Sequence, residues 1–176
     1  MTENAPDPQP AASTTPRTVL VLAEDALGEA DVQHIVGMHP DDDLRYEVFV
    51  PADSERNFAV ELIDHLSVGE LKQAWHDLRR DVPSRPQAEK TAEERVDQTE
   101  ALFAAAGREA SGVVTADDPL PTVQERAGRG DVVELVVVTY PHAVEDTFHR
   151  DWASRAREEL DDLPVLHLYA GTSEIG

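Results

Sequence analysis

Two runs of consecutive apolar residues limit the folds open to this chain more than any other feature of its sequence. TVLVLAED spans residues 18–25, and DVVELVVVT spans residues 131–139. Strands that are buried on both faces appear in a sequence as continuous apolar runs, whereas strands with one face in water alternate apolar and polar residues. Both runs therefore predict fully buried strands, which are typical of a parallel sheet in an α/β protein.

Shorter segments around these runs complete an alternating order of strands and helices. Further strands are predicted at RYEVFV (45–50), ASGVVTADD (110–118) and LPVLHLYAG (163–171). Apolar residues at helical spacing predict helices around residues 32–39, from residue 88 to a C-terminal cap at Gly107, within 119–130 and over 150–161. Strands that alternate with helices in this way indicate parallel βαβ units.

Two segments do not fit this alternation. Residues 1–16 hold four prolines among small polar residues and cannot bury enough apolar surface to become ordered, so we expect a disordered tail. Residues 54–81 repeat apolar residues at helical spacing and predict an additional helical segment, which ends at the break DVPSRPQ, residues 81–87.

The charge of the chain excludes several classes of partner. Fifteen basic residues against 36 acidic ones give a net charge of −21, which repels nucleic acid and anionic membranes. No apolar run approaches the roughly 20 residues of a membrane span, the N-terminus has no signal-peptide pattern, and there is no cysteine. We expect a cytoplasmic protein with no nucleic-acid or membrane partner; its Arg-rich, Lys-poor usage is typical of bacteria with GC-rich genomes.

In three of these stretches the chain resembles the universal stress protein family. TVLVLAED matches the family's first strand, VVTADDPLPTVQERA (113–127) its third strand and short helix, and VVELVVVT with LPVLHLYAG its last two strands. The resemblance implies a three-layer α/β/α fold, with a five-stranded parallel sheet of order 3-2-1-4-5 and helices on both faces. It also implies one domain over residues 17–171, with 54–87 as a helical insertion and 172–176 as a tail.

The chain departs from the family at the glycine-rich loop that binds nucleotide. Nucleotide-binding members carry glycines two and five residues after the position of Thr139, and a Gly-Ser/Thr pair at the start of the last helix. The corresponding residues here are Pro141, Val144, Asp151 and Trp152. Pro141 has no N–H to donate, and Asp151 brings negative charge to a helix start that would otherwise attract phosphate. We therefore expect neither ATP nor another cofactor.

A ligand pocket, if present, is expected at the carboxyl ends of the strands. In open parallel sheets ligands bind there, where the strand order reverses, which is between the first and fourth strands. The candidate residues at this edge are Glu24, Asp25, Asp117, Tyr140, Pro141 and His142. Their carboxylates would suit a hard divalent cation or a cationic ligand. Acids are also common capping and turn residues, and we favour this second interpretation and assign no metal site.

The last predicted strand is a candidate dimer interface. Related family members pair this strand across a two-fold axis, and VLHLY contains no lysine or proline to prevent it. We therefore expect a homodimer with Val165, Leu166, Leu168 and Tyr169 near the seam.

No catalytic motif is present in the sequence, which has no nucleophile elbow, phosphate-binding loop or dinucleotide fingerprint. We therefore expect a non-enzymatic module, and the family resemblance implies that it acts in stress response through an unidentified protein partner or a small ligand. Two alternatives remain open. One is a protein that binds ATP and Mg²⁺ weakly, and the other is a small metal-dependent hydrolase or transferase with His142 as its base.

Overall fold

The structure is a computed structural model that describes residues 17–40, 43–52, 85–140, 149–160 and 162–171, without the side chains of 85–88 and 149–151. The expected tails, nearly all of the expected insertion, and both Pro141 and His142 lie outside the described residues. None of the described helices is long and apolar enough to cross a membrane.

The described elements follow the predicted order of strands and helices. The strands are β1 (Arg17–Ala23), β2 (Leu44–Pro51), β3 (Glu109–Thr115), β4 (Val132–Thr139) and β5 (Val165–Tyr169). The helices are α1 (Glu29–Gly37), α4 (Arg85–Ala105), α5 (Leu120–Ala127) and α6 (His149–Glu159). Helix α4 begins inside the expected break at 81–87, because a proline such as Pro86 is compatible with the first turn of a helix.

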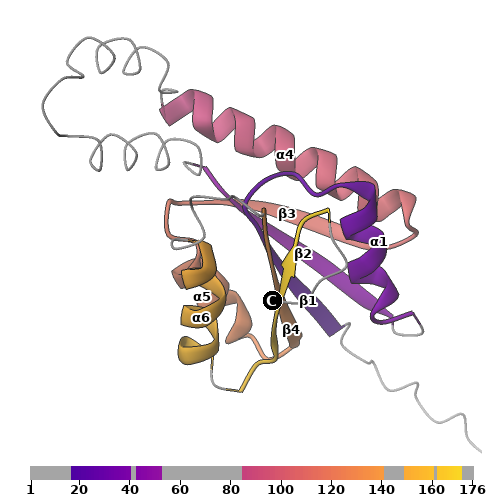
Figure 1. Cartoon of the computed structure of the whole chain (residues 1–176), viewed down its shortest axis with the longest axis vertical. Helices are drawn as coiled ribbons and strands as arrows, with labels where there is room; N and C mark the ends of the chain where they lie inside the picture. Colours follow the sequence, from indigo (N-terminus) through magenta and orange to yellow (C-terminus); the bar gives the residue numbers. More distant parts are fainter. Residues whose placement is uncertain (1–16, 41–42, 53–84, 141–148, 161, 172–176) are drawn as a thin grey trace, which may run out of the picture.

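All five strands are parallel and lie in the order β3-β2-β1-β4-β5, which confirms the predicted topology (Figure 1). The two apolar runs form the neighbouring strands β1 and β4 at the centre of the sheet. From Val19 to Ala23, every residue of β1 is fully buried, as the absence of alternation predicted.

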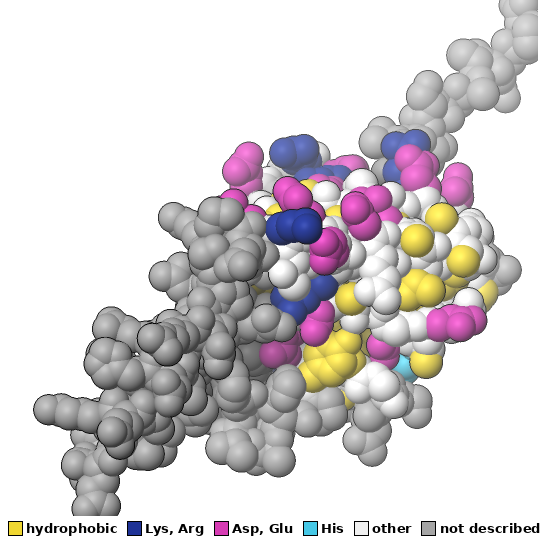
Figure 2. Space-filling model, turned by 90° about the horizontal axis from the view of Figure 1, so that it is seen from above, with side chains coloured by type: hydrophobic (Ala, Val, Ile, Leu, Met, Phe, Trp, Pro, Cys, Tyr) yellow, Lys and Arg dark blue, Asp and Glu magenta, His cyan; other side chains and the backbone are white. Residues whose placement is uncertain are grey.

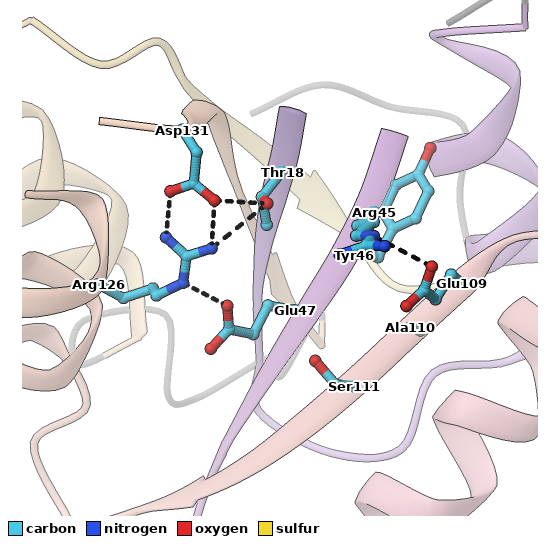
Figure 3. A pocket seen from close by; sticks show the side chains of 9 residues that line it. All are labelled: Thr18, Arg45, Tyr46, Glu47, Glu109, Ala110, Ser111, Arg126 and Asp131. Carbon is cyan, nitrogen blue, oxygen red and sulfur yellow. Dashed lines mark hydrogen bonds and ion pairs between the residues drawn. The ribbon is translucent and has the colours of Figure 1, made fainter. Parts of the chain in front are cut away.

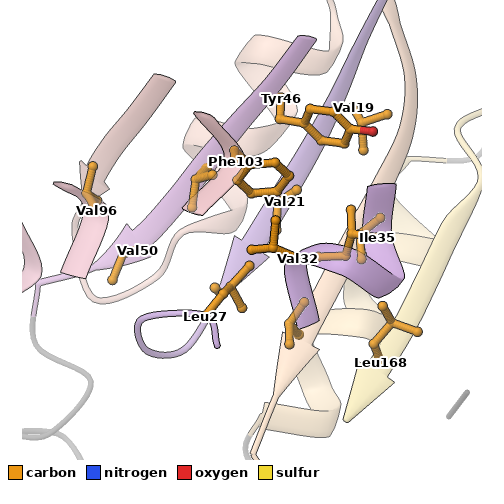
Figure 4. Close-up of a cluster of buried hydrophobic side chains, with 14 of the residues drawn as sticks. Val19, Val21, Leu27, Val32, Ile35, Tyr46, Val50, Val96, Phe103 and Leu168 are labelled. Carbon is orange, nitrogen blue, oxygen red and sulfur yellow. The ribbon is translucent and has the colours of Figure 1, made fainter. Parts of the chain in front are cut away.

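Helices cover both faces of the sheet and make two separate cores. On one face, alternate residues of β1 pack with α1 and α4, including Val19, Val21, Val32 and Phe103 (Figure 4). On the other face, Leu20 and Leu22 pack with α5 and α6. The predicted three-layer α/β/α architecture is therefore present.

The inner face of α4 was predicted correctly from its helical spacing. Its residues Ala92, Val96, Thr99 and Phe103 are all buried. Gly107, the predicted C-terminal cap, follows the helix with a φ of 75°, a backbone conformation that glycine adopts without strain.

Candidate functional site

The carboxyl ends of β1 and β4 meet where the sequence placed the candidate pocket. The structure brings three of the predicted residues together there: Glu24 and Asp25 follow β1, and Tyr140 follows β4. The backbone N–H of Tyr140 donates to Glu24 Oε2 at 3.2 Å, and Glu24 is 9 % exposed. A carboxylate of the chain is therefore held between the two strand ends.

The loop from β1 to α1 directs its backbone N–H groups to other side chains of the chain. Ala26 N donates to Asp25 Oδ1 at 2.7 Å, and Leu27 N donates to Thr99 Oγ1 at 3.1 Å. Asp25 also forms an ion pair of 2.6 Å with Arg95 of α4, whose side chain is 10 % exposed. These contacts fix the loop against α4.

Asp31, in the first turn of α1, binds two backbone N–H groups that are far apart in the sequence. Its Oδ2 accepts from Gly28 N at 2.9 Å, which is one half of a capping box, and its Oδ1 accepts from Gly171 N at 2.7 Å. Asp31 is 9 % exposed. One buried carboxylate thus ties the start of α1 to the residues that follow β5.

The side chain of Tyr140 spans the same edge. Its hydroxyl donates to the carbonyl oxygen of Ala26 at 2.6 Å, so the ring crosses from the end of β4 to the loop after β1. Burial, and then the negative charges of Asp25, Asp31 and Glu24, raise the pKa of Tyr140 above its ordinary 10.0. The edge is therefore an environment that disfavours additional negative charge.

Tyr140→Phe is expected to lower the free energy of unfolding at pH 7 by about 1 kcal/mol, because it removes one partly buried hydrogen bond. Since the folded protein favours the neutral phenol, this contribution is present below pH 10 and is lost as the pH rises beyond it. Urea unfolding at pH 7 and pH 11 should show that the difference between the wild type and the variant shrinks at the higher pH. An equal difference at both values would contradict this role.

Asp117, the remaining predicted residue that the structure describes, does not join this group. Asp117 is exposed and follows β3, which is separated from β1 by β2. Its neighbour Asp118 pairs with Arg155 of α6 at 3.0 Å. Within the described ranges, no group of three His, Asp or Glu residues is placed to hold a metal ion.

Asp31, Arg95 and Thr99 were not predicted from the sequence to be members of this group. Two signals were available. Asp31 stands three residues after Gly28, where an acid completes a helix start, and Arg95 lies on the apolar face of α4, where a charge requires a partner. The bond from Asp31 to Gly171 spans 140 residues and left no local signal.

Comparison with known proteins gives information on the fold. No protein-family model and no curated protein matches the sequence. Among solved structures, the chain is similar to the universal stress protein from Archaeoglobus fulgidus, with 13 % sequence identity and a TM-score of 0.51. The match covers 86 % of this chain and 93 % of that chain. At this identity the similarity concerns the fold alone, and the chain has a universal-stress-protein-like α/β fold.

Proposed function

We propose that this chain is a non-enzymatic stress-response module that does not use ATP and acts as a homodimer through contacts with a protein or a small ligand. One observation carries the proposal. Five backbone N–H groups at the carboxyl edge of the sheet donate to oxygens of the chain's own side chains; they belong to Ala26, Leu27, Gly28, Tyr140 and Gly171.

Phosphate groups bind where backbone N–H groups converge without an internal acceptor. At this edge Glu24, Asp25 and Asp31 already accept four of the five N–H bonds. A triphosphate would have to displace these carboxylates and would then be repelled by them. The net charge of −21 adds to this repulsion, and acidic side chains are spread over the face of the molecule in Figure 2.

Thermal unfolding tests the proposal that the chain does not bind ATP. A ligand at 100 times its Kd stabilises a protein by about 2.7 kcal/mol, so a nucleotide-binding chain would melt several degrees higher with ATP and Mg²⁺. We expect the same Tm with buffer, with Mg²⁺ alone and with millimolar ATP–Mg²⁺. A shift that requires ATP would support the alternative of a weak nucleotide-binding protein and contradict our proposal.

The two edges of the described sheet differ in a way that favours β5 as the dimer seam. At the β3 edge, Gly112 N donates to Glu100 Oε1 of α4 at 2.5 Å, so a carboxylate covers the backbone of that strand. At the β5 edge, Val165, Leu166 and Tyr169 are partly exposed. Leu168 is 3 % exposed and packs within its own chain, so its contribution to a seam would be indirect.

Leu166→Lys is expected to convert the proposed dimer into a monomer, because it places a charge in a strand that would pair with its copy. Ala110→Lys is the matched control, since Ala110 is a partly exposed residue of the opposite edge strand. Sedimentation equilibrium at tens of micromolar measures the outcome. A monomeric wild type, or a dimer that survives Leu166→Lys and dissociates with Ala110→Lys, would contradict the β5 seam.

A further inference from the structure

A cavity of about 340 Å³ opens at the amino ends of the strands, at the opposite end of the sheet from the site described above (Figure 3). Its lining includes Thr18, Arg45, Glu47, Glu109, Ser111 and Arg126. No ligand site was predicted here from the sequence, because ligands of open parallel sheets bind at the carboxyl ends of the strands. The volume lies at the lower end of the range for small-molecule sites, about 300–1,000 Å³.

Four polar side chains of β2 and β3 form the floor of the cavity. Arg45 pairs in register with Glu109, and Glu47 pairs with Ser111. Because side chains alternate along a strand, all four lie on the same face of the sheet, opposite the face on which α4 packs. The floor therefore consists of two adjacent polar pairs.

Arg126 of α5 forms one wall and fixes two of the acids. Its Nε lies 2.5 Å from Glu47 Oε2, and its Nη1 and Nη2 reach Asp131 at 2.6 and 2.9 Å. The hydrogen bonds from Arg126 lower the pKa of Asp131 to about 2, and that acid is therefore ionised at neutral pH. Both carboxylates are held rigidly before any ligand arrives.

This network leaves two acceptors directed to the cavity. Among the residues that the structure describes, Glu47 bonds only through Oε2, so its Oε1 has no protein partner. The same holds for the hydroxyl of Ser111, the neighbour of Glu47 in the register. In total, three carboxylates and two guanidinium groups line the cavity, which leaves one negative charge without a counterpart.

We propose that this cavity binds a small organic cation whose ammonium or guanidinium group donates hydrogen bonds to Glu47 Oε1 and Ser111 Oγ. A cation is favoured over an anion because of the uncompensated charge, to which the net charge of −21 adds a long-range attraction. An organic cation is favoured over a metal ion, since no described group of three acidic or histidine side chains is placed to hold one. The site is separate from the carboxyl ends of the strands, so this proposal and the proposed function can be tested independently.

Isothermal titration calorimetry of the full chain with agmatine tests this site, because agmatine carries both a guanidinium and an ammonium group. We expect saturable binding with a Kd of about 1 mM or tighter at low ionic strength, weakened by 150 mM salt. Glu47→Gln removes the charged acceptor, and Ser111→Leu fills the cavity from an exposed position that the fold tolerates. Each should weaken binding at least about tenfold, which corresponds to 1.4 kcal/mol.

Glu125→Gln is the matched control, because Glu125 is an exposed acid of α5 outside the cavity lining. It should bind agmatine as the wild type does, and glutarate, which is an anion, should give no heat with any of the proteins. Circular dichroism checks that each variant is folded. If Glu47→Gln does not fold, Ser111→Leu still tests the site. Absence of binding to the wild type, or equal affinity in Ser111→Leu and Glu125→Gln, would overturn the proposal.

Discussion

Replacement of Arg126 by methionine is expected to lower the free energy of unfolding at pH 7 by about 3 kcal/mol, the cost of removing one partner from a buried ion pair. The side chain of Arg126 is 10 % exposed and joins Glu47, Asp131 and Thr18. Methionine keeps most of its apolar packing but leaves two carboxylates close together without a cation. Urea denaturation followed by circular dichroism measures the loss.

Arg45→Met is the matched control for this prediction. The ion pair between Arg45 and Glu109 lies in water, with side chains 52 % and 68 % exposed, and such pairs contribute less than about 1 kcal/mol. If the two arginine variants lost the same amount of stability, Arg126 would have no special role in holding α5 to the sheet.

Acid should also weaken this network, as the pH falls below about 4. The pKa of Asp131 is about 2 in the folded chain, against 3.8 ordinarily, so its stabilising effect is present above pH 4 and is lost as the pH falls toward 2. In Arg126→Met this dependence should largely vanish. Unfolding curves at pH 7, 4 and 3 for the wild type and the variant measure this difference.

Asp31→Ala is expected to cost about 3 kcal/mol, because it removes two charge-assisted hydrogen bonds, from the N–H groups of Gly28 and Gly171, that a buried carboxylate accepts. Asp31→Asn should fall between the wild type and alanine, since an amide oxygen still accepts but carries no charge. Thermal or urea unfolding at pH 7 gives both values.

Glu29→Ala separates this effect from a general effect of charge at the helix start. Glu29 also lies in the first turn of α1 but is exposed, so its removal should change stability by less than about 1 kcal/mol. Equal losses in the two alanine variants would mean that Asp31 acts on the helix dipole and not through its two bonds.

The sheet could be predicted from sequence because the continuous apolar composition of its central strands indicates that both of their faces are buried. The apolar runs of β1 and β4 required cover on both faces, and the alternation of strands with helices then favoured parallel pairing. The inner face of α4 could also be predicted from a local pattern, since its apolar residues recur at helical spacing. The strand order 3-2-1-4-5 came from the family resemblance, because local patterns do not specify which strands become neighbours.

The contacts at both edges of the sheet could not be predicted in the same way. Glu24 and Tyr140 were placed at one edge from topology, yet their bond depends on side-chain directions that no pattern specifies. The network of Arg126 joins α5 to two different strands, and its acidic partners Glu47 and Asp131 looked like ordinary surface charges in the sequence. Long-range polar contacts depend on packing geometry, which local sequence patterns do not specify.

We propose that internal carboxylates occupy the backbone donors that a nucleotide phosphate would need. A ¹⁵N–¹H correlation spectrum recorded during titration with ATP–Mg²⁺ observes these donors directly. We expect the amide signals of Ala26, Gly28, Tyr140 and Gly171 to stay in place up to millimolar nucleotide. Saturable shifts of these signals with ATP–Mg²⁺, absent with Mg²⁺ alone, would contradict it.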